Sequence, residues 1–322
     1  MAKIAHQISR VLKSLNIYLF FGEFWVLKSN DLFRQRFSGN VKRVIPLSII
    51  MPEGPEVKRI TERMNGYLAG EILTNISFLD LHYRSKQVRD EVNEFMNTMP
   101  HTIDSVRCKG KFIYWTLDGG KWHIWQTLGM SGTWRKGKKP PHARLTLHTT
   151  KGDFHYKDSR KFGTFKFFED KPDLLMKKLE KDLGPDMLNE NVDDGTFITQ
   201  LRKKDHHNIC KVIMNQKVIC GVGNYIKSEA LYKARIDPWK TVGMLTDTQL
   251  QLLNQKIKEV IYSAYQSKGA TFSDYQLPDG SIGTYTFKFE VYNKRRDPHG
   301  HNVIKEVTPD KRMTHWIKEV QV

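Results

Sequence analysis

Short runs with the composition of β-strands, separated by turn residues, fill residues 110–169. They are rich in aromatic and β-branched residues and cover 110–117, 121–128, 142–150, 153–158 and 164–169. The DGG sequence at 118–120 predicts a turn between the first two runs, and TTKGDF predicts a hairpin between the third and the fourth. So many strands in so short a stretch favour a β-sandwich or a barrel-like domain.

Helical patterns flank this β-rich stretch on both sides. Before it, Val57, Ile60, Met64 and Leu68 recur at helical spacing, and Gly70 is placed to end the helix. After it, the patterns predict helices over 193–204, 207–216, 225–234 and the residues that follow Thr246. Beyond Gly269 loop and strand patterns return, with strands predicted at 284–292, 302–307 and 312–317.

The predicted fold class is therefore α+β with several domains. We expect an N-terminal extension at 1–50, a β-sandwich domain with an N-terminal helix at 51–178, a helical domain at 179–268, and a loop followed by a small β-hairpin at 269–322. Three cysteines, Cys108, Cys210 and Cys220, form no CxxC pair and imply no disulfide framework. They indicate a reducing compartment.

The chain is strongly basic. Its 322 residues include 52 Lys and Arg against 35 Asp and Glu, which gives a net charge of +17. Such a charge predicts a polyanionic partner, most often nucleic acid. A basic protein without such a partner is the alternative, and the placement of the charge decides between the two.

Residues 1–50 differ from the rest of the chain. They carry eight Lys or Arg and two acids, a net charge of +6. Their apolar stretch at 15–27 is short and interrupted by Glu23, which argues against a membrane span. A transit-like leader is one interpretation. We favour an upstream reading-frame extension, because Met51 directly precedes the PEGPEV sequence and is competent as a start.

A GVG sequence at 221–223 precedes the predicted helix at 225–234. A glycine turn that feeds a helix N-terminus exposes backbone N–H groups, which suit a phosphate. In this interpretation Asn224 is the N-cap, and Lys217 and Lys227 flank the anion site. The alternative is a tight turn between packed helices.

Six motifs together are more specific than any one of them. In chain order they are MPEGPEV (51–57), CKGKFIYW (108–115), LGMSG (128–132), KDSRKFG (157–163), LGPDML (183–188) and GVGNYIKSEAL (221–231). As a set, over 51–322, they resemble the formamidopyrimidine-DNA glycosylase/endonuclease VIII family of base-excision repair enzymes. PEGPE is more similar to the endonuclease VIII branch. The resemblance implies a helical domain of the helix–two-turns–helix type.

The resemblance also implies a mechanism that starts from an N-terminal proline. Pro52 would attack the sugar C1′ as a secondary amine and form a Schiff base, which requires that the peptide bond before it be absent. Glu53 would protonate the sugar ring oxygen. Lys111 would contact phosphate and assist elimination, and Glu56 would lie near the damaged nucleotide. From spacing alone, an ordinary exposed hairpin lysine is the better interpretation of Lys111. Glu56 is equally a first-turn helix acid.

The target base has to leave the stack before attack, and the resemblance implies which side chains fill the gap. They are Met130, Arg160 and Phe162, an apolar and cationic wedge. From composition alone Met130 and Phe162 could instead be core residues. Residues 269–285, rich in glycine, would form a loop over the extruded base.

The C-terminal region departs from the commonest form of the family, in which four cysteines bind zinc on a hairpin finger. Residues 291–322 contain no cysteine, and Ile317 and Val320 stand where the last two ligands would be. This resembles a zincless finger, in which packing replaces the metal, with Arg312 as its DNA-contacting arginine. The resemblance counts Arg312 as a catalytic residue together with Pro52, Glu53 and Lys111. His299, His301 and His315 have poor spacing for zinc, so we expect no metal.

The sequence therefore predicts a bifunctional DNA glycosylase and AP lyase that excises oxidised pyrimidines and cleaves the strand by β,δ-elimination. Oxidised purines and formamidopyrimidines are the alternative substrates. A non-catalytic DNA-binding protein is the alternative from another class, if Pro52 is never exposed.

We expect damaged DNA as partner, DNA contacts from Asn224 and Lys217, no cofactor, no membrane and a monomer. The expected location is a reducing compartment that holds DNA: nuclear, cytoplasmic or a viral factory. Organellar import by residues 1–50 is not favoured.

Overall fold

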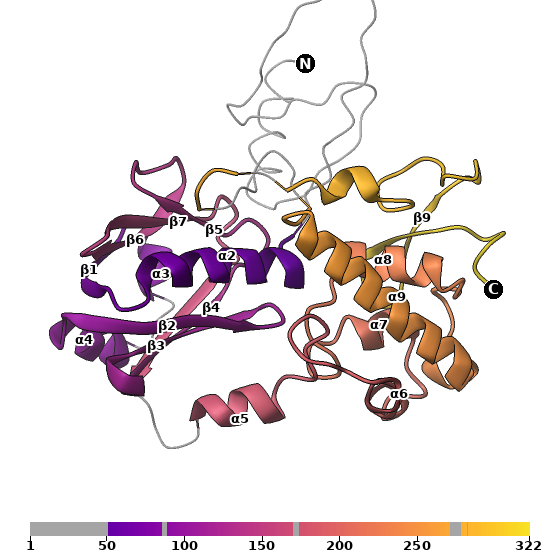
Figure 1. Cartoon of the computed structure of the whole chain (residues 1–322), viewed down its shortest axis with the longest axis horizontal. Helices are drawn as coiled ribbons and strands as arrows, with labels where there is room; N and C mark the ends of the chain where they lie inside the picture. Colours follow the sequence, from indigo (N-terminus) through magenta and orange to yellow (C-terminus); the bar gives the residue numbers. More distant parts are fainter. Residues whose placement is uncertain (1–50, 86–88, 170–173, 271–277, 282) are drawn as a thin grey trace, which may run out of the picture. The chain divides into compact units, whose positions relative to one another are not determined.

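The computed structural model describes residues 51–322 except 86–88, 170–173, 271–277 and 282 (Figure 1). All of them lie in the second of two compact units, Leu47–Val322. The predicted N-terminal extension at 1–50 and part of the predicted loop at 269–285 lie outside the described residues.

The described chain starts with a helix, α2 (Gly54–Leu68), and continues into a β-domain. Its strands are β1 (Ile72–Phe78), β2 (His101–Lys109), β3 (Phe112–Leu117), β4 (Trp122–Thr127), β5 (Thr133–Lys136), β6 (Ala143–Thr149), β7 (Gly152–Lys157) and β8 (Thr164–Glu169). The short helices α3 (Leu81–Ser85) and α4 (Arg89–Asn97) follow β1, and a 3-10 turn, η1 (Asp118–Gly120), joins β3 to β4.

The strands form a sandwich in which one short pairing joins the two layers. The strand order is β5-β7-β6-β1-β2-β3-β4-β8, and β1 meets β2 at only two residue pairs, Ile72↔Thr102 and Leu73↔His101. Side chains from both layers share one core, which includes Phe154 from β7 and Phe167 from β8. The predicted hairpins are confirmed, because β3 pairs with β4 and β6 pairs with β7.

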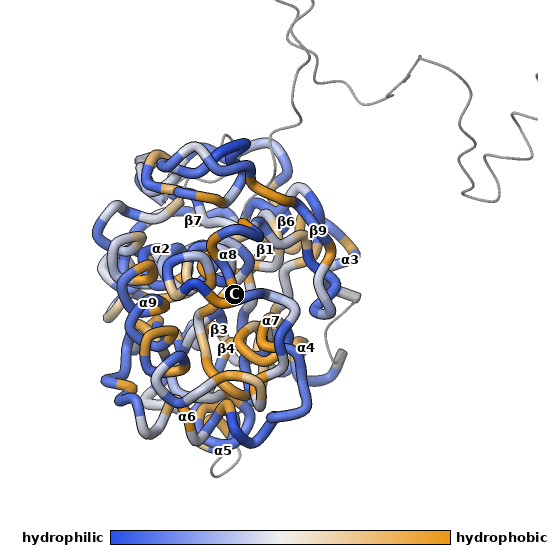
Figure 2. The backbone as a smooth tube through the Cα atoms, turned by 90° about the vertical axis from the view of Figure 1, so that its right-hand side faces the viewer, coloured by the Kyte–Doolittle hydropathy of each residue, from blue (hydrophilic) through white to orange (hydrophobic). Residues whose placement is uncertain are grey.

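A helical part follows the β-domain. It contains α5 (Leu174–Lys181), α6 (Asp194–Arg202), α7 (Ile209–Ile213), α8 (Asn224–Lys233), η2 (Val242–Met244) and α9 (Asp247–Gln266). Four of the five residues of α7 are apolar and buried, and α7 is among the orange segments of Figure 2. As predicted, α9 starts after Thr246, whose side chain accepts a hydrogen bond from the Gln249 N–H. No helix among the described residues combines the length and apolar character needed to cross a membrane.

The prediction of a strand over 284–292 is wrong. The structure has a 3-10 helix, η3 (Tyr285–Lys288), at this place. The reason lies in the aromatic spacing: Tyr285, Phe289 and Tyr292 all pack on the Tyr225 ring, with centroid distances of 5.9, 5.4 and 6.3 Å. The short helix brings Tyr285 and Phe289, four residues apart, to one neighbour, whereas in a strand they would lie about 13 Å apart along the chain.

The C-terminal hairpin consists of β9 (Ile304–Val307) and β10 (Met313–Trp316). After it, Ile317 is fully buried against Tyr232 and Val291, and Val320 packs on the same cluster. The side-chain packing expected at these two positions is therefore present. The hairpin is also tied to α8, because Lys227 donates to Asp310 at 2.6 Å inside the protein.

This ion pair corrects the prediction that Lys227 flanks an anion site. The Lys227 side chain is fully buried and already neutralised by Asp310. Asp310 also accepts a hydrogen bond from the Thr308 hydroxyl at 2.5 Å, which fixes the hairpin turn.

We predict that Asp310→Asn destabilises the chain by about 3–5 kcal/mol, because Lys227 is left as an unpaired buried charge. Adding Lys227→Met to this variant removes that charge and should restore most of the loss. Urea unfolding followed by tryptophan fluorescence measures both. An equal loss in the single and the double variant would show that the ion pair is not what holds the hairpin.

Candidate active site

Three glycine-containing turns meet through their backbones. The Gly54 N–H donates to the Gly221 carbonyl at 2.9 Å, and a Cβ on Gly54 would lie 3.0 Å from the Gly221 Cα. A Cβ on Gly110 would lie 2.8 Å from the Gly221 nitrogen and 2.6 Å from the Cβ of Cys220. Gly221 itself has φ +95°, a conformation that favours glycine. The PEGPE, KGKF and GVGN motifs therefore converge on one junction, with Glu53 and Lys111 each one residue away from it.

The N-terminus of α8 is occupied by a side chain of the protein itself. The Glu53 carboxylate accepts hydrogen bonds from the N–H groups of Tyr225 at 2.9 Å and Ile226 at 3.3 Å. A Cβ on Gly223 would lie 2.1 Å from the Glu53 carboxyl carbon, so a side chain there would displace the carboxylate from these N–H groups. The prediction of a phosphate at these N–H groups is therefore wrong: the anion is Glu53.

Asn224 is the first residue of α8, and the N-cap is Gly223, which corrects the predicted N-cap. The Asn224 side-chain amide donates to the Met313 carbonyl at 2.9 Å and so links α8 to the hairpin. Lys217 is exposed on the turn that leads from α7 to the glycine junction.

Glu56 is a buried structural centre of the site. It accepts hydrogen bonds from the Glu53 N–H at 2.9 Å, the Tyr225 hydroxyl at 3.1 Å and the Ala270 N–H at 2.7 Å. It lies in the first turn of α2, which agrees with the interpretation of Glu56 as a first-turn helix acid. Through Ala270 it also anchors the start of the predicted loop over the base. Burial raises the pKa of Glu56.

The electrostatics of the junction suit proton transfer near neutral pH. Burial raises the pKa of Glu53 to about 7, against the opposing effect of the Lys111 charge. Burial also lowers the pKa of Lys111, against the attraction of Glu53 and Glu56. Pro52 is buried beside them, and Lys111 is half-buried.

Arg312 is exposed on the turn of the hairpin, and its Nη1 lies 3.9 Å from the Met51 sulfur. The Arg312 charge is close enough to contribute to the lowered pKa of Lys111. The structure thus brings together all four predicted catalytic residues: Pro52, Glu53, Lys111 and Arg312.

Asp186, in the LGPDML motif, was not singled out from the sequence. Its buried carboxylate accepts hydrogen bonds from the Gly110 N–H at 2.6 Å and the Leu188 N–H at 2.9 Å. It therefore sets the position of the turn that carries Lys111. An aspartate just before a chain reversal is a weak sequence signal for such a role.

The predicted wedge residues lie together at the surface of the β-domain. Arg160 Nη1 lies 3.7 Å from the Met130 sulfur, and the Phe162 side chain is 56% exposed. A Cβ on Gly129 would lie 2.5 Å from the Phe162 carbonyl carbon, so the loop at 128–132 is in contact with the loop at 157–163. Phe162 is therefore not a core residue, while Met130 is half-buried.

Asp158, which the sequence reasoning also missed, holds these wedge loops. Its fully buried carboxylate accepts hydrogen bonds from the Gly163 N–H at 2.8 Å, the Tyr83 hydroxyl at 2.5 Å and the Ser131 hydroxyl. The Arg160 N–H donates to Ser131 at 3.0 Å. The network preorganises the loop from which Arg160 and Phe162 project.

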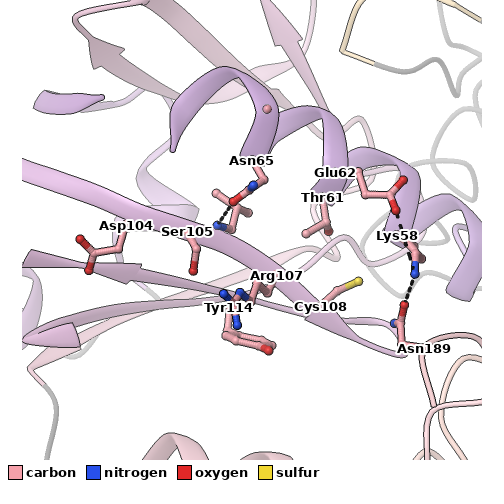
Figure 3. A pocket seen from close by; sticks show the side chains of 12 residues that line it. Lys58, Thr61, Glu62, Asn65, Asp104, Ser105, Arg107, Cys108, Tyr114 and Asn189 are labelled. Atoms are coloured by element: carbon pink, nitrogen blue, oxygen red, sulfur yellow. Dashed lines mark hydrogen bonds and ion pairs between the residues drawn. The ribbon is translucent and has the colours of Figure 1, made fainter. Parts of the chain in front are cut away.

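A polar groove of about 520 Å³ lies between α2 and β2 (Figure 3). The Asn65 side chain reaches across to accept a hydrogen bond from the Val106 N–H at 2.8 Å. Lys58, Glu62, Arg107 and Tyr114 also line the groove, and none of the predicted site residues does.

Of the histidines near the hairpin, His301 has a carboxylate partner, while the buried Nδ1 of His315 has no hydrogen-bond partner among the described residues. His301 Nδ1 lies 2.9 Å from Asp297, and burial lowers the pKa of His315 to about 4. Within the described ranges, no three His, Cys, Asp or Glu side chains are grouped so that they could hold a metal ion.

Two family models match the chain. The formamidopyrimidine-DNA glycosylase N-terminal domain covers residues 51–165, and the formamidopyrimidine-DNA glycosylase H2TH domain covers 183–276. The formamidopyrimidine-DNA glycosylase of Bdellovibrio bacteriovorus is 30% identical over 77% of this chain and 90% of that protein. The chain belongs to the formamidopyrimidine-DNA glycosylase family. Its members are base-excision repair DNA glycosylases that also act as AP lyases, so the predicted enzyme class is confirmed.

Solved structures agree with the fold. MutM (Fpg) from Thermus thermophilus has a TM-score of 0.73 and 26% identity, covering 84% of this chain and 98% of that one. Lactococcus lactis Fpg, in a complex with DNA that contains an oxidised pyrimidine, has a TM-score of 0.72 and 24% identity over 84% of this chain and 99% of that one. The predicted β-sandwich and helical domain are confirmed.

We predict a pH-dependent stability difference between the natural chain and Glu53→Gln. Because folding raises the pKa of Glu53 from 4.5 to about 7, the folded protein binds this proton more tightly than the unfolded chain. Raising the pH through this range should lower the free energy of unfolding of the natural chain by about 3 kcal/mol relative to the variant. Urea unfolding at pH 5 and pH 8 measures it. Parallel behaviour of the two proteins would mean that Glu53 ionises normally.

Proposed function

We propose that the chain, when it begins at Pro52, excises formamidopyrimidines and oxidised purines from DNA and then cleaves the strand by β,δ-elimination. The observation that carries the proposal is the junction at Gly221. There Glu53, with a pKa near 7, directly follows Pro52, and the charge of Lys111 is close enough to oppose the rise in the pKa of Glu53.

The steps follow from the groups present. A free Pro52 nitrogen is a secondary amine, and terminal amines have a pKa well below that of an ordinary lysine, so a useful fraction is unprotonated near neutrality. It attacks C1′ of the damaged nucleotide, the C1′–base bond breaks, and the base leaves with the proton that the Pro52 nitrogen gives up. The protonated Glu53 then donates to the sugar ring oxygen as the ring opens. The resulting iminium acidifies C2′, from which a proton is lost in the elimination.

DNA contacts come from exposed groups around this centre. We expect Arg312 on the hairpin and the exposed Lys217 to meet phosphates, while Asn224 supports the hairpin through its hydrogen bond to the Met313 carbonyl. The chain from Pro52 onward carries +11 of the net charge of +17, which supports salt-dependent binding. Met130, Arg160 and Phe162 form the wedge that fills the gap left by the extruded base.

The substrate class rests on the relatives. The curated proteins similar to this chain are named formamidopyrimidine-DNA glycosylases, which supports the alternative of the sequence analysis better than its first choice. Oxidised pyrimidines remain the second candidate, because PEGPE and a hairpin without cysteine are similar to endonuclease VIII-like enzymes. A non-catalytic DNA-binding role would follow only if the Pro52 nitrogen stays acylated in every form of the protein.

The test compares lesions in duplex oligonucleotides, using a chain that starts at Pro52. We expect kcat/KM for a formamidopyrimidine lesion to exceed that for an oxidised pyrimidine at least about tenfold. Glu53→Gln should abolish base excision while binding of the same DNA is kept. A preference for the pyrimidine lesion would select the second candidate, and binding without excision of any lesion would select the non-catalytic role.

A further inference from the structure

A second group of reactive side chains lies on the β-domain, on three strands of one layer. In the strand order β7, β6 and β1 are neighbours (Figure 1). Each of these strands sends a side chain into the core, namely Ile76, Leu147 and Phe154. Because side chains alternate between the two faces of a strand, the adjacent residues Ser77, His148 and Asp153 lie together on the outer face of the sheet.

The three side chains form a hydroxyl–imidazole–carboxylate chain. His148 Nε2 lies 2.8 Å from the Ser77 Oγ, and His148 Nδ1 lies 2.8 Å from the Asp153 Oδ1. The strand register accounts for both contacts, because His148 is opposite Asp153 on β7 and opposite Asn75 on β1, two residues before Ser77. In this arrangement a histidine can act as general base on a serine.

The hydrogen-bond partners also fix the position of the histidine proton. A carboxylate accepts hydrogen bonds and donates none, so the proton of the neutral His148 ring lies on Nδ1, which donates to Asp153. Nε2 then carries the lone pair and accepts from the Ser77 hydroxyl. Ser77 therefore donates its proton to a base, as an activated nucleophile does.

A second hydroxyl–imidazole pair on the same layer serves only the fold. His155 Nε2 donates to the Gly137 carbonyl at 2.7 Å, so His155 Nδ1 accepts from the Thr146 hydroxyl at 2.8 Å. His155 is 3% exposed, and within the described ranges no carboxylate is bonded to it. The side chains of His148 and Asp153 are instead 34% and 47% exposed, so a molecule from solvent can reach them.

Asn75 adds a donor for the charge that develops on a carbonyl oxygen. It lies on the face of Ser77, two residues earlier in β1, and is exposed. Its Oδ1 accepts a hydrogen bond from the Ile76 N–H at 2.8 Å, which orients the amide. In the part of the chain that the structure describes, its Nδ2 has no acceptor, so both N–H bonds are available to an oxyanion beside Ser77.

We propose that Ser77, His148 and Asp153 are the catalytic residues of a second site, which hydrolyses small carboxylic esters by acyl transfer. Because the three residues stand on an exposed sheet face, we expect short acyl groups and good leaving groups as substrates. The proposal goes beyond the proposed function and is independent of it, since it needs neither DNA nor a free Pro52 nitrogen.

The bond changes of the reaction balance. As the Ser77 Oγ adds to the ester carbonyl, its proton passes to His148 Nε2, and Asp153 stabilises the imidazolium through Nδ1. The bond from the carbonyl carbon to the leaving oxygen breaks, and that oxygen takes the proton from Nε2. A water that gives its proton to the same nitrogen then attacks the acyl group. The carboxylic acid leaves, and Ser77 regains its hydroxyl proton.

The experiment follows hydrolysis of p-nitrophenyl acetate by the full chain, with mass spectrometry of the tryptic peptides after an acid quench. We expect an acetyl group on Ser77. Ser77→Ala should lower the rate of hydrolysis at least about tenfold, and Asp153→Asn should do the same because an amide can hold the other ring tautomer. Thr74→Ala is the matched control on β1, since the Thr74 hydroxyl donates to the His148 carbonyl at 3.0 Å and not to the ring. It should stay within about twofold of the natural chain.

Labelling of the natural chain gives a result that does not depend on any variant. A fluorophosphonate, which reacts with activated serines, should attach to Ser77. Absence of this label, acetyl groups on lysines alone, or a rate that is unchanged in Ser77→Ala would overturn the inference. The three side chains would then be a cross-strand contact that stabilises the sheet. Thermal unfolding of each variant verifies that it is folded at the assay temperature.

Discussion

The contact of the Gly221 turn with the backbones at Gly54 and Gly110 is the constraint on which the site depends. The three turns come from the start of α2, the β2–β3 connection and the entrance to α8, which are far apart in the chain. Side chains at these positions would separate the turns by the width of a methyl group or more. The close approach also lets the Glu53 carboxylate reach the N-terminus of α8, where the helix dipole and two N–H groups stabilise its charge.

The stabilisation of the Glu53 charge is incomplete, and the proposed function depends on this. A carboxylate at a helix N-terminus normally has a low pKa, but burial outweighs the two hydrogen bonds and raises the pKa of Glu53 to about 7. Glu56 adds to the effect from the next turn of α2. The same burial lowers the pKa of Lys111, against the attraction of Glu53 and Glu56.

The elements that the sequence predicts are those with regular patterns. The strands over 110–169 alternate or cluster aromatic residues, and α9 carries a stripe with a capping threonine. β1 was missed because a register shift between Leu73 and Asn75 breaks its alternation, and β5 because it has only four residues. The aromatic residues of 284–292 favour a strand by composition, but their contacts with Tyr225 impose a helical turn.

The site residues also divide into those that a sequence motif marks and those whose role only long-range contacts reveal. Pro52, Glu53, Lys111 and Arg312 could be named because they stand in motifs of a known family. Asp158 and Asp186 act by accepting hydrogen bonds from backbone N–H groups of distant loops, and no residue pattern reports such contacts. Lys227 was misjudged because its partner, Asp310, lies 83 residues away in the chain.

The central claim is that the junction at Gly221 makes the terminal nitrogen of Pro52 the nucleophile of base excision. A crystal structure of the borohydride-trapped complex, formed by a chain that starts at Pro52 on a formamidopyrimidine-containing duplex, tests it most directly. The account predicts continuous electron density from the Pro52 nitrogen to C1′, with Glu53 in reach of the opened sugar oxygen. A covalent bond from any other side chain, with the Pro52 nitrogen free, would contradict it.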